Sequence, residues 1–253
     1  MSRPANPEAM HGWLGHRHQP YEPGSPAHAF FRDIVALRFP KKEFFETLAV
    51  LDLARRWINP LGPVFELCAG HGFLGMLIAC DPRPRPIVLL DRTIPPNRHR
   101  LRALMAAHAP NLRHRLEEVR GDVQDWDRYG RGTFIGVHAC GAATDVLIRT
   151  ALAVRARFVV VPCCIRRSDA LRYGVERVKG FETEIDGRRL AGVRREGYRV
   201  RMISFDPCIT PWNRVLIAWP EEEPESPGGG IEPGPLPFRL PPRRADAPRH
   251  SSH

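Results

Sequence analysis

The chain has 253 residues, enough for one sizeable core with extensions and too few for two large domains. Its formal charge of +10 favours attraction to polyanions such as RNA, although the excess of arginine over lysine is also typical of GC-rich coding. No stretch approaches the ~18 apolar residues of a membrane span, and no signal peptide is recognisable. We therefore expect a cytoplasmic protein with no membrane partner, whose six cysteines are reduced thiols.

The N-terminal part of the chain predicts a flexible segment followed by a helical cap. Residues 1–26 are rich in Pro, His and Gly and show no apolar periodicity. Residues 27–58 carry two apolar stripes at helical spacing, interrupted at Pro40. We expect two amphipathic helices here, which cap a sheet formed by the residues that follow.

Residues 59–220 alternate between predicted strands and helices. We expect strands at 63–67, 86–90, 115–120, 133–138 and 157–162, with helices from Phe73, at 97–108 and at 143–153. This alternation predicts an α/β fold of Rossmann-like type, a mostly parallel sheet with helices on both faces. A strand pair at 200–205 and 214–219 adds a final antiparallel strand.

Two stretches outside these elements differ in character. Residues 170–200 are charged and remain ambiguous, with a possible helix at 169–178. Residues 221–253 are rich in Pro and Gly and contain an acidic cluster, so they cannot bury enough apolar surface to offset the entropy of ordering. We expect this tail to be disordered.

A glycine-rich turn between a strand and a helix is the most informative local signal. The run VFELCAGHGFLG at 64–75 places Glu66 near the strand end, followed by Gly70 and Gly72, where the backbone can bend and approach a ligand. Cys68 stands where the dinucleotide pattern G-x-G-x-x-G has its first glycine, which disfavours NAD. Such a turn also occurs as plain scaffolding in α/β proteins.

Acidic residues also follow the next two predicted strands. Asp91 ends the strand PIVLLD, where a carboxylate is placed to accept hydrogen bonds from ribose hydroxyls. Together with the acid-led glycine turn, this resembles class I S-adenosylmethionine methyltransferases, whose turn after the third strand resembles the run from Gly121 to Asp125. The resemblance implies S-adenosylmethionine as donor, bound by Glu66, Cys68, Gly70, Gly72, Asp91 and Asp122.

Further runs carry a narrower resemblance. LLDR at 89–92, HACGAATDVLIR at 138–149 and the pair Cys163-Cys164 resemble the catalytic domain of the eukaryotic tRNA acceptor-stem 2′-O-ribose methyltransferase family, over roughly residues 60–167. This implies transfer to a ribose hydroxyl of RNA, and of tRNA in particular. The sequence departs from the family at Val137, where the family has lysine, at Ile165-Arg166 after the cysteine pair, and in lacking its zinc fingers.

The fourth and fifth predicted strands should bring the catalytic residues together. His138 is our candidate general base, with a structural histidine as the alternative. Cys140 and Cys163 are either small buried residues or nucleophiles of the kind that cytosine-5 RNA methyltransferases use. No pair has the C-x2-C spacing typical of zinc ligands, so no metal site is predicted.

Three further residues are candidates for either a structural or a binding role. Asp145 lies at the start of a predicted helix, where an N-cap is its first interpretation. Trp212 and Arg214, in the loop between the last two strands, would either hold a base or phosphate or anchor the hairpin.

Taken together, the sequence predicts an S-adenosylmethionine-dependent methyltransferase that acts on RNA at a ribose or a base. A small-molecule methyltransferase, and a catalytically silent donor-binding or RNA-binding module of the same fold, are the alternatives. The oligomeric state is left open.

Overall fold

The computed structural model describes residues 21, 23–59, 61–81, 83, 85–125, 130–137, 139–165, 167–178 and 180–225. The candidate base His138 lies outside the described residues. So do nearly all of the expected flexible N-terminus and the tail beyond residue 225.

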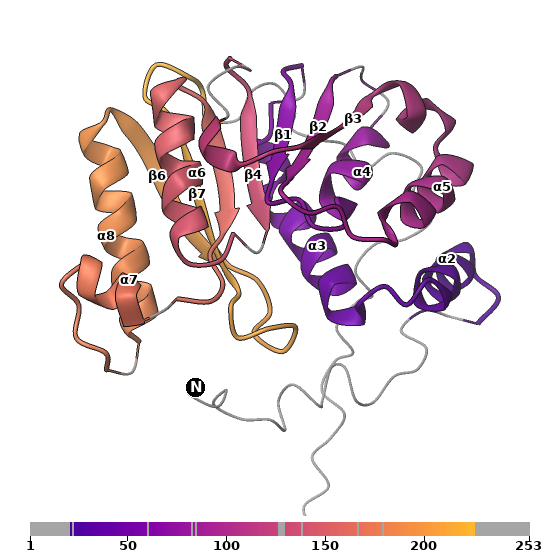
Figure 1. Ribbon diagram of the computed structural model, residues 1–253, viewed down its shortest axis with the longest axis horizontal. Helices are drawn as coiled ribbons and strands as arrows, with labels where there is room; N and C mark the ends of the chain where they lie inside the picture. The colour runs from indigo at the N-terminus through magenta and orange to yellow at the C-terminus, as the bar shows by residue number, and fades with distance from the viewer. Residues whose placement is uncertain are drawn as a thin grey trace, which may run out of the picture.

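Seven strands form one sheet in the order β3-β2-β1-β4-β5-β7-β6. All pairings from β3 to β5 are parallel, whereas β7 is antiparallel to both β5 and β6. This arrangement confirms the predicted fold class, a Rossmann-like sheet with an antiparallel strand near one edge (Figure 1). The strands are β1 (Val64–Leu67), β2 (Ile87–Asp91), β3 (Leu116–Arg120), β4 (Thr133–Val137), β5 (Arg157–Val161), β6 (Tyr198–Ser204) and β7 (Arg214–Pro220).

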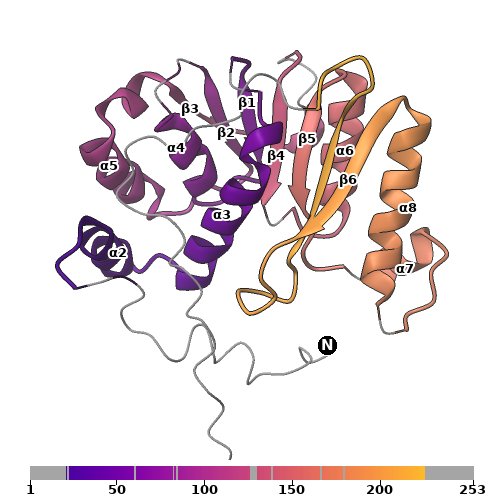
Figure 2. The same ribbon diagram turned by 180° about the vertical axis from the view of Figure 1, so that it is seen from behind.

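Helices cover both faces of the sheet, and each face has its own apolar cluster. One cluster joins the sheet to α2 (Pro26–Ala36), α3 (Lys41–Ala54), α4 (Phe73–Ala79) and α5 (Arg98–His108). The other joins it to α6 (Ala142–Ala153) and α8 (Phe181–Arg195). Accordingly, α6 lies in front of the sheet in Figure 1, and α3 lies in front of it in Figure 2. Strand side chains alternate between the two clusters, as β geometry requires.

The two helices expected at 27–58 are present as α2 and α3. The hydroxyl of Ser25 caps α2 by accepting a hydrogen bond from His28 N at 3.1 Å. On α3, the ring of Phe44 stacks on Phe73 at the start of α4, with ring centroids 5.5 Å apart. The cap is therefore packed on the helix that follows the glycine-rich turn.

The region at 170–200 contains a long helix that the apolar pattern did not reveal. α8 covers 15 residues, preceded by the short α7 (Arg167–Arg172) instead of a helix at 169–178. The buried face of α8 includes Asp186 and Arg189, which form an ion pair at 2.9 Å. Because these charged residues occupy buried positions, the apolar stripe of the helix is interrupted in the sequence.

The first residues of the predicted tail, 221–225, contact the sheet. Arg157 on β5 is 3% exposed and donates to the carboxylate of Glu223 at 2.9 Å and to Pro224 O at 2.8 Å. Arg155 pairs with Glu222 at 2.6 Å. Charge pairing holds residues 221–225 against the amino end of β5, and apolar periodicity does not reveal such contacts.

Candidate active site

A cavity of about 750 Å³ opens at the carboxyl ends of β1, β2, β3 and β4. Parallel α/β sheets bind their ligands in this position, at the point where the strand order reverses between β1 and β4. Glu43 and Thr47 of α3 contribute to the wall, so the helical cap forms part of the site. All six predicted donor-binding residues except Gly72 line this cavity.

The glycine-rich turn adopts left-handed backbone conformations that favour glycine. Gly70 has φ +52° and Gly72 has φ +72°, and Gly72 leads directly into α4. A Cβ built on Gly70 would meet no atom within 4 Å, although the residue lines the cavity. The backbone of Gly70 is therefore open to close approach by a ligand.

Cys68 also has a positive φ, of +57°, at the position where the dinucleotide pattern has glycine. A residue other than glycine is energetically unfavourable in the left-handed region, so the backbone at Cys68 is strained. Burial, together with the nearby carboxylate of Asp91, raises the pKa of the Cys68 thiol to about 11. Cys68 is thus a neutral thiol in the cavity wall at physiological pH.

Asp91 lies at the end of β2 and organises the turn. Its Oδ2 accepts a hydrogen bond from Gly70 N at 2.8 Å, and its Oδ1 accepts one from Thr93 N at 2.9 Å. Each carboxylate oxygen retains a second lone pair, and the half-buried side chain lines the cavity. The carboxylate is therefore preorganised to accept hydroxyl groups of a ligand.

Glu66 is buried beneath the turn, where its Oε2 accepts a hydrogen bond from Gly75 N at 2.7 Å. Gly75 is the third residue of α4, so Glu66 satisfies one of the unpaired amides at the helix start. Burial raises the pKa of Glu66 to about 8, even though the Gly75 amide and the nearby Arg98 favour the ionised form. At neutral pH the carboxyl is predominantly protonated.

Asp122 follows β3 on the far side of the cavity from β4. Its Oδ1 accepts a hydrogen bond from Gln124 N at 3.1 Å, and Arg92 Nη1 lies 3.8 Å from its Oδ2. Asp122, Gly121 and Gln124 all line the cavity. A third acid at a strand end is thus present in the same space as Asp91.

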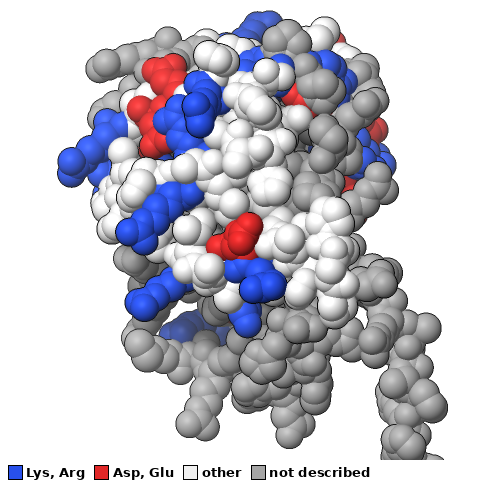
Figure 3. Space-filling model, turned by 90° about the vertical axis from the view of Figure 1, so that its right-hand side faces the viewer, with Lys and Arg blue, Asp and Glu red and all other residues white. Residues whose placement is uncertain are grey.

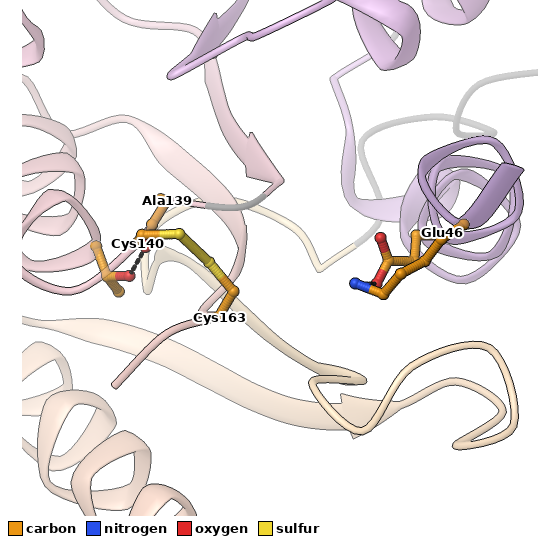
Figure 4. The surroundings of a disulfide bond; sticks show 6 residues. Glu46, Ala139, Cys140 and Cys163 are labelled. Atoms are coloured by element: carbon orange, nitrogen blue, oxygen red, sulfur yellow. Dashed lines mark hydrogen bonds and ion pairs between the residues drawn. A yellow bond between two sulfur atoms is a disulfide. The ribbon is translucent and has the colours of Figure 1, made fainter. Parts of the chain in front are cut away.

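The predicted catalytic cysteines lie after β4 and β5, and the expectation of reduced thiols is corrected there. Cys140 and Cys163 are joined by a disulfide, with Cα atoms 5.2 Å apart (Figure 4). The paired strands β4 and β5 end side by side, which brings these two residues to neighbouring positions. Cys140 lines the cavity, and Cys163 is buried. Whether either residue is catalytic stays a prediction, as it does for His138.

Sequence reasoning missed two contacts that hold the turn in place. The guanidinium of Arg98, at the start of α5, is fully buried and donates to the carbonyl of Gly70 through Nε at 2.8 Å and through Nη2. His71 Nδ1 lies 3.1 Å from both carboxylate oxygens of Glu43 on α3. In each contact the two residues are 28 positions apart in the sequence, so no local sequence pattern predicts either contact.

Asp145 has a structural role, but it does not cap a helix. It accepts hydrogen bonds from Arg172 at 2.8 Å, Tyr173 at 2.8 Å and Arg189 at 2.7 Å, and so joins α6 to α7 and α8. The N-cap of α6 is Gly141. Asp145 therefore belongs to an ionic cluster that secures the second helical layer.

The two candidate clamp residues differ in their surroundings. Arg214 donates to Asp186 at 2.7 Å and is engaged with α8. The ring of Trp212 lies under the ammonium of Lys42, 5.5 Å from ring centroid to Nζ. Trp212 therefore links the β6–β7 loop to the start of α3, and a role in holding a base or phosphate stays a prediction.

Comparisons with known proteins agree with this geometry. Residues 58–168 match a family model described as "Methyltransferase domain". No curated protein matches the chain. Within the described residues, no helix is long and apolar enough to cross a membrane.

Solved structures are similar to the chain at low sequence identity. A Corynebacterium glutamicum protein has a TM-score of 0.50 at 13% identity, with 85% of this chain and 96% of that chain covered. A cofactor-bound protein from MTB has a TM-score of 0.49 at 18% identity, with 88% of this chain and 100% of that chain covered. An rRNA methylase from Streptococcus thermophilus has a TM-score of 0.45 at 11% identity, with 70% of this chain and 94% of that chain covered.

The matched domain and the sheet agree on the class of protein. The family match spans β1 to β5, the strands whose carboxyl ends carry the cavity. The chain is a methyltransferase enzyme, and its cavity is the candidate active site.

Proposed function

We propose that this enzyme transfers a methyl group from S-adenosylmethionine to RNA, with a ribose 2′-hydroxyl as the favoured acceptor. The position of Asp91 is the main support for S-adenosylmethionine as the donor. Its carboxylate stands in the cavity wall, held by the amide of Gly70, with lone pairs left for two vicinal hydroxyls. Charge-assisted hydrogen bonds of this kind are stronger than neutral ones.

The remaining residues of the cavity also fit a nucleoside donor. Gly70 leaves open space for close approach, and Asp122 supplies an acceptor for an exocyclic amino group. Glu66 and Cys68 support the turn from below and present neutral groups to the cavity at pH 7. When bound, S-adenosylmethionine supplies an electrophilic methyl group. The chain then has to align the acceptor with it and remove a proton.

On the acceptor side we assign His138 as the base that takes the hydroxyl proton. Cys140 lines the cavity and is bonded to the buried Cys163, and in this reading the pair shapes the β4 side of the cavity. The alternative is a cytosine-5 mechanism, in which a cysteine thiolate adds covalently to the base before transfer. His138→Ala should reduce 2′-O transfer on the order of a hundredfold, while Cys163→Ser retains measurable activity. Loss of all activity in Cys163→Ser, with a denaturation-resistant RNA adduct in the wild type, would favour the cytosine-5 alternative.

The charge distribution supports a polyanionic acceptor. The exposed Arg92 lines the cavity, and Arg120 donates to its carbonyl at 3.2 Å, so two exposed guanidinium groups stand near the opening. In Figure 3, Lys and Arg side chains are spread over the face shown, with fewer acidic side chains among them. Such a surface attracts a phosphate backbone and makes its binding salt-dependent.

One labelling experiment tests the proposal. The protein is incubated with donor that carries a labelled methyl group and with total RNA, protein or small-metabolite fractions. We expect label in RNA, located by nuclease digestion at ribose 2′ positions, and uptake that falls as salt rises. Label confined to the metabolite fraction would identify a small-molecule methyltransferase and refute the RNA assignment.

A further inference from the structure

Three cysteine sulfurs lie together just beyond the carboxyl ends of β4 and β5, on the β4 side of the cavity. The Sγ atoms of Cys140, Cys163 and Cys164 all lie within 4.8 Å of one another. Cys140 and Cys163 are bonded, and Cys164 is a free thiol. A disulfide with a third thiol at this distance has the composition needed for thiol–disulfide exchange.

The fold places the three sulfurs together. β4 and β5 are parallel and in register, with Val137 opposite Val161 at their carboxyl ends. Cys140 follows one strand end by three residues, and Cys163 follows the other by two. The loops that carry them run on into α6 and α7, so the bond links the β4–α6 segment, which lines the cavity, to the buried start of the β5–α7 segment.

Accessibility differs among the cysteines in a way that assigns them different roles. Cys163 is only 5% exposed, so a reagent from solution reaches it poorly. Cys164, the adjacent residue, is exposed. Cys140 is also accessible, in the cavity wall. A soluble disulfide therefore reaches the buried Cys163 only through a neighbouring cysteine, and Cys164 lies close enough to pass the change on to the pair.

We propose that Cys140, Cys163 and Cys164 form a reversible disulfide-exchange site, with Cys164 as the entry thiol for a small soluble disulfide of the glutathione type. The exchange itself is independent of the proposed function. Its consequence, slower methyl transfer when Cys140 and Cys163 are joined, rests on that function.

The exchange balances with an external disulfide RSSR as oxidant. The Cys164 thiolate attacks RSSR, which forms a mixed disulfide on Cys164 and releases RS⁻. The Cys140 thiolate then attacks the Sγ of Cys164, which forms a Cys140–Cys164 bond and releases a second RS⁻. The Cys163 thiolate attacks the Sγ of Cys140, which forms the observed bond and returns Cys164 as thiolate. Cys140 and Cys163 are oxidised, RSSR is reduced, and the two protons they lose pass to the two RS⁻ groups.

The bond bears on the acceptor side more than on the donor side. Asp91, Gly70 and Asp122 belong to the β1–β3 part of the cavity, whereas Cys140 lines its β4 part. The bond faces α3, from which the side chain of Glu46 projects (Figure 4). The bond fixes Cys140, on the β4 side of the cavity wall, to the buried Cys163. In the proposal, this constraint hinders alignment of the acceptor. We expect transfer to slow on the order of tenfold, because small misplacements of reacting groups are costly.

Peptide mapping of the full chain tests the exchange. The protein is equilibrated with reduced and oxidised glutathione at several ratios, quenched with acid, alkylated and digested, and linked peptides are identified by mass spectrometry. We expect the Cys140–Cys163 link to form and disappear reversibly. Cys164→Ser should slow its formation by about tenfold or more, because the exposed thiol adjacent to the buried Cys163 is gone. Cys208→Ser, outside the cluster, should react at the wild-type rate.

Three outcomes would overturn the proposal. Cys140 and Cys163 that alkylate fully at every glutathione ratio would show that no disulfide forms. A wild-type rate in Cys164→Ser would remove its role as entry thiol. A bound zinc ion, detected by elemental analysis, whose removal by a chelator exposes the three thiols, would assign the cluster to a metal. Equal methyl transfer by the oxidised and reduced protein would refute the control of transfer, whereas transfer by neither form would refute the proposed function instead.

Discussion

At the residue scale, Gly75 shows how tightly the turn and helix α4 are packed on the sheet. A Cβ built at this position would lie 2.4 Å from Leu89 Cδ2 and 2.7 Å from Glu66 Oε2. Replacing glycine by alanine inside a helix ordinarily stabilises a protein by roughly 0.5–1 kcal/mol. Here the added methyl group has no space, and it would push the Glu66 carboxyl away from the Gly75 amide.

We predict that Gly75→Ala lowers the free energy of unfolding by about 1–3 kcal/mol, as overpacking usually does. Gly187 provides a matched control, since it lies within helix α8 and a Cβ there would meet no atom within 4 Å. Gly187→Ala should therefore stabilise the protein. Urea unfolding of both variants measures the two changes in the free energy of unfolding. Equal changes of the same sign would contradict the packing argument.

The buried carboxyl of Glu66 makes stability depend on pH. Its pKa is raised to about 8 in the folded protein from an ordinary value of 4.5, so folding favours the protonated form. The resulting stabilisation is fully present below about pH 4.5 and is lost as the pH rises through about 8.

We predict that raising the pH from 5 to 9 lowers the melting temperature of Glu66→Gln less than that of the wild type. The two decreases should differ by at least about 2 °C. Glutamine keeps an oxygen that can accept from Gly75 N and carries no ionisable group. The exposed Glu117→Gln should follow the wild-type curve. Parallel curves for wild type and Glu66→Gln would show that the raised pKa of Glu66 does not govern this pH range.

At the element scale, the first residues of the tail form a strap across the amino end of β5. Glu222 and Glu223 pair with Arg155 and Arg157, and the carbonyl of Pro224 accepts from Arg157 as well. Arg157 is almost fully buried, so removal of these partners leaves a buried charge with fewer hydrogen bonds. Such a change is strongly destabilising.

Two truncations separate the strap from the rest of the tail. Deleting residues 226–253 should leave the melting temperature nearly unchanged, because the composition of that segment offers little apolar surface to the core. Deleting residues 221–253 should lower it by several degrees, through loss of the Arg157 contacts. Thermal melts that coincide for the two truncations would show that the strap contributes nothing.

The elements that the sequence predicts well are those with apolar periodicity or strand-end motifs. β1 with its glycine turn, Asp91 at the end of β2, and the strands of the β4–β5 pair all follow from such local patterns. α8 escaped prediction because Asp186 and Arg189 interrupt its apolar face and are neutralised by partners distant in sequence. The same reason applies to Arg98 under Gly70 and to Glu43 beside His71. Contacts between distant polar residues depend on the completed fold, so only the structure reveals them.

At the scale of the whole molecule, the cap, the glycine turn and the strand ends form one connected site. α3 contributes Glu43 to the cavity wall and ties the turn through His71, while Arg98 of α5 holds Gly70 from the other side. The cavity is thereby preorganised, which limits the ordering that binding of a ligand requires. On its β4 side the wall includes Cys140, which is bonded to Cys163.

The central claim is that this cavity binds S-adenosylmethionine through Asp91, and calorimetric titration of the donor into the purified protein tests it most directly. We predict measurable binding to the wild type and an affinity about tenfold or more lower for Asp91→Ala, since a charge-assisted hydrogen bond contributes about 1.5–3 kcal/mol. Asp52→Ala, which removes an exposed acid on α3 outside the cavity, should bind like the wild type. Absence of binding to the folded wild type, or an unchanged dissociation constant in folded Asp91→Ala, would contradict the claim.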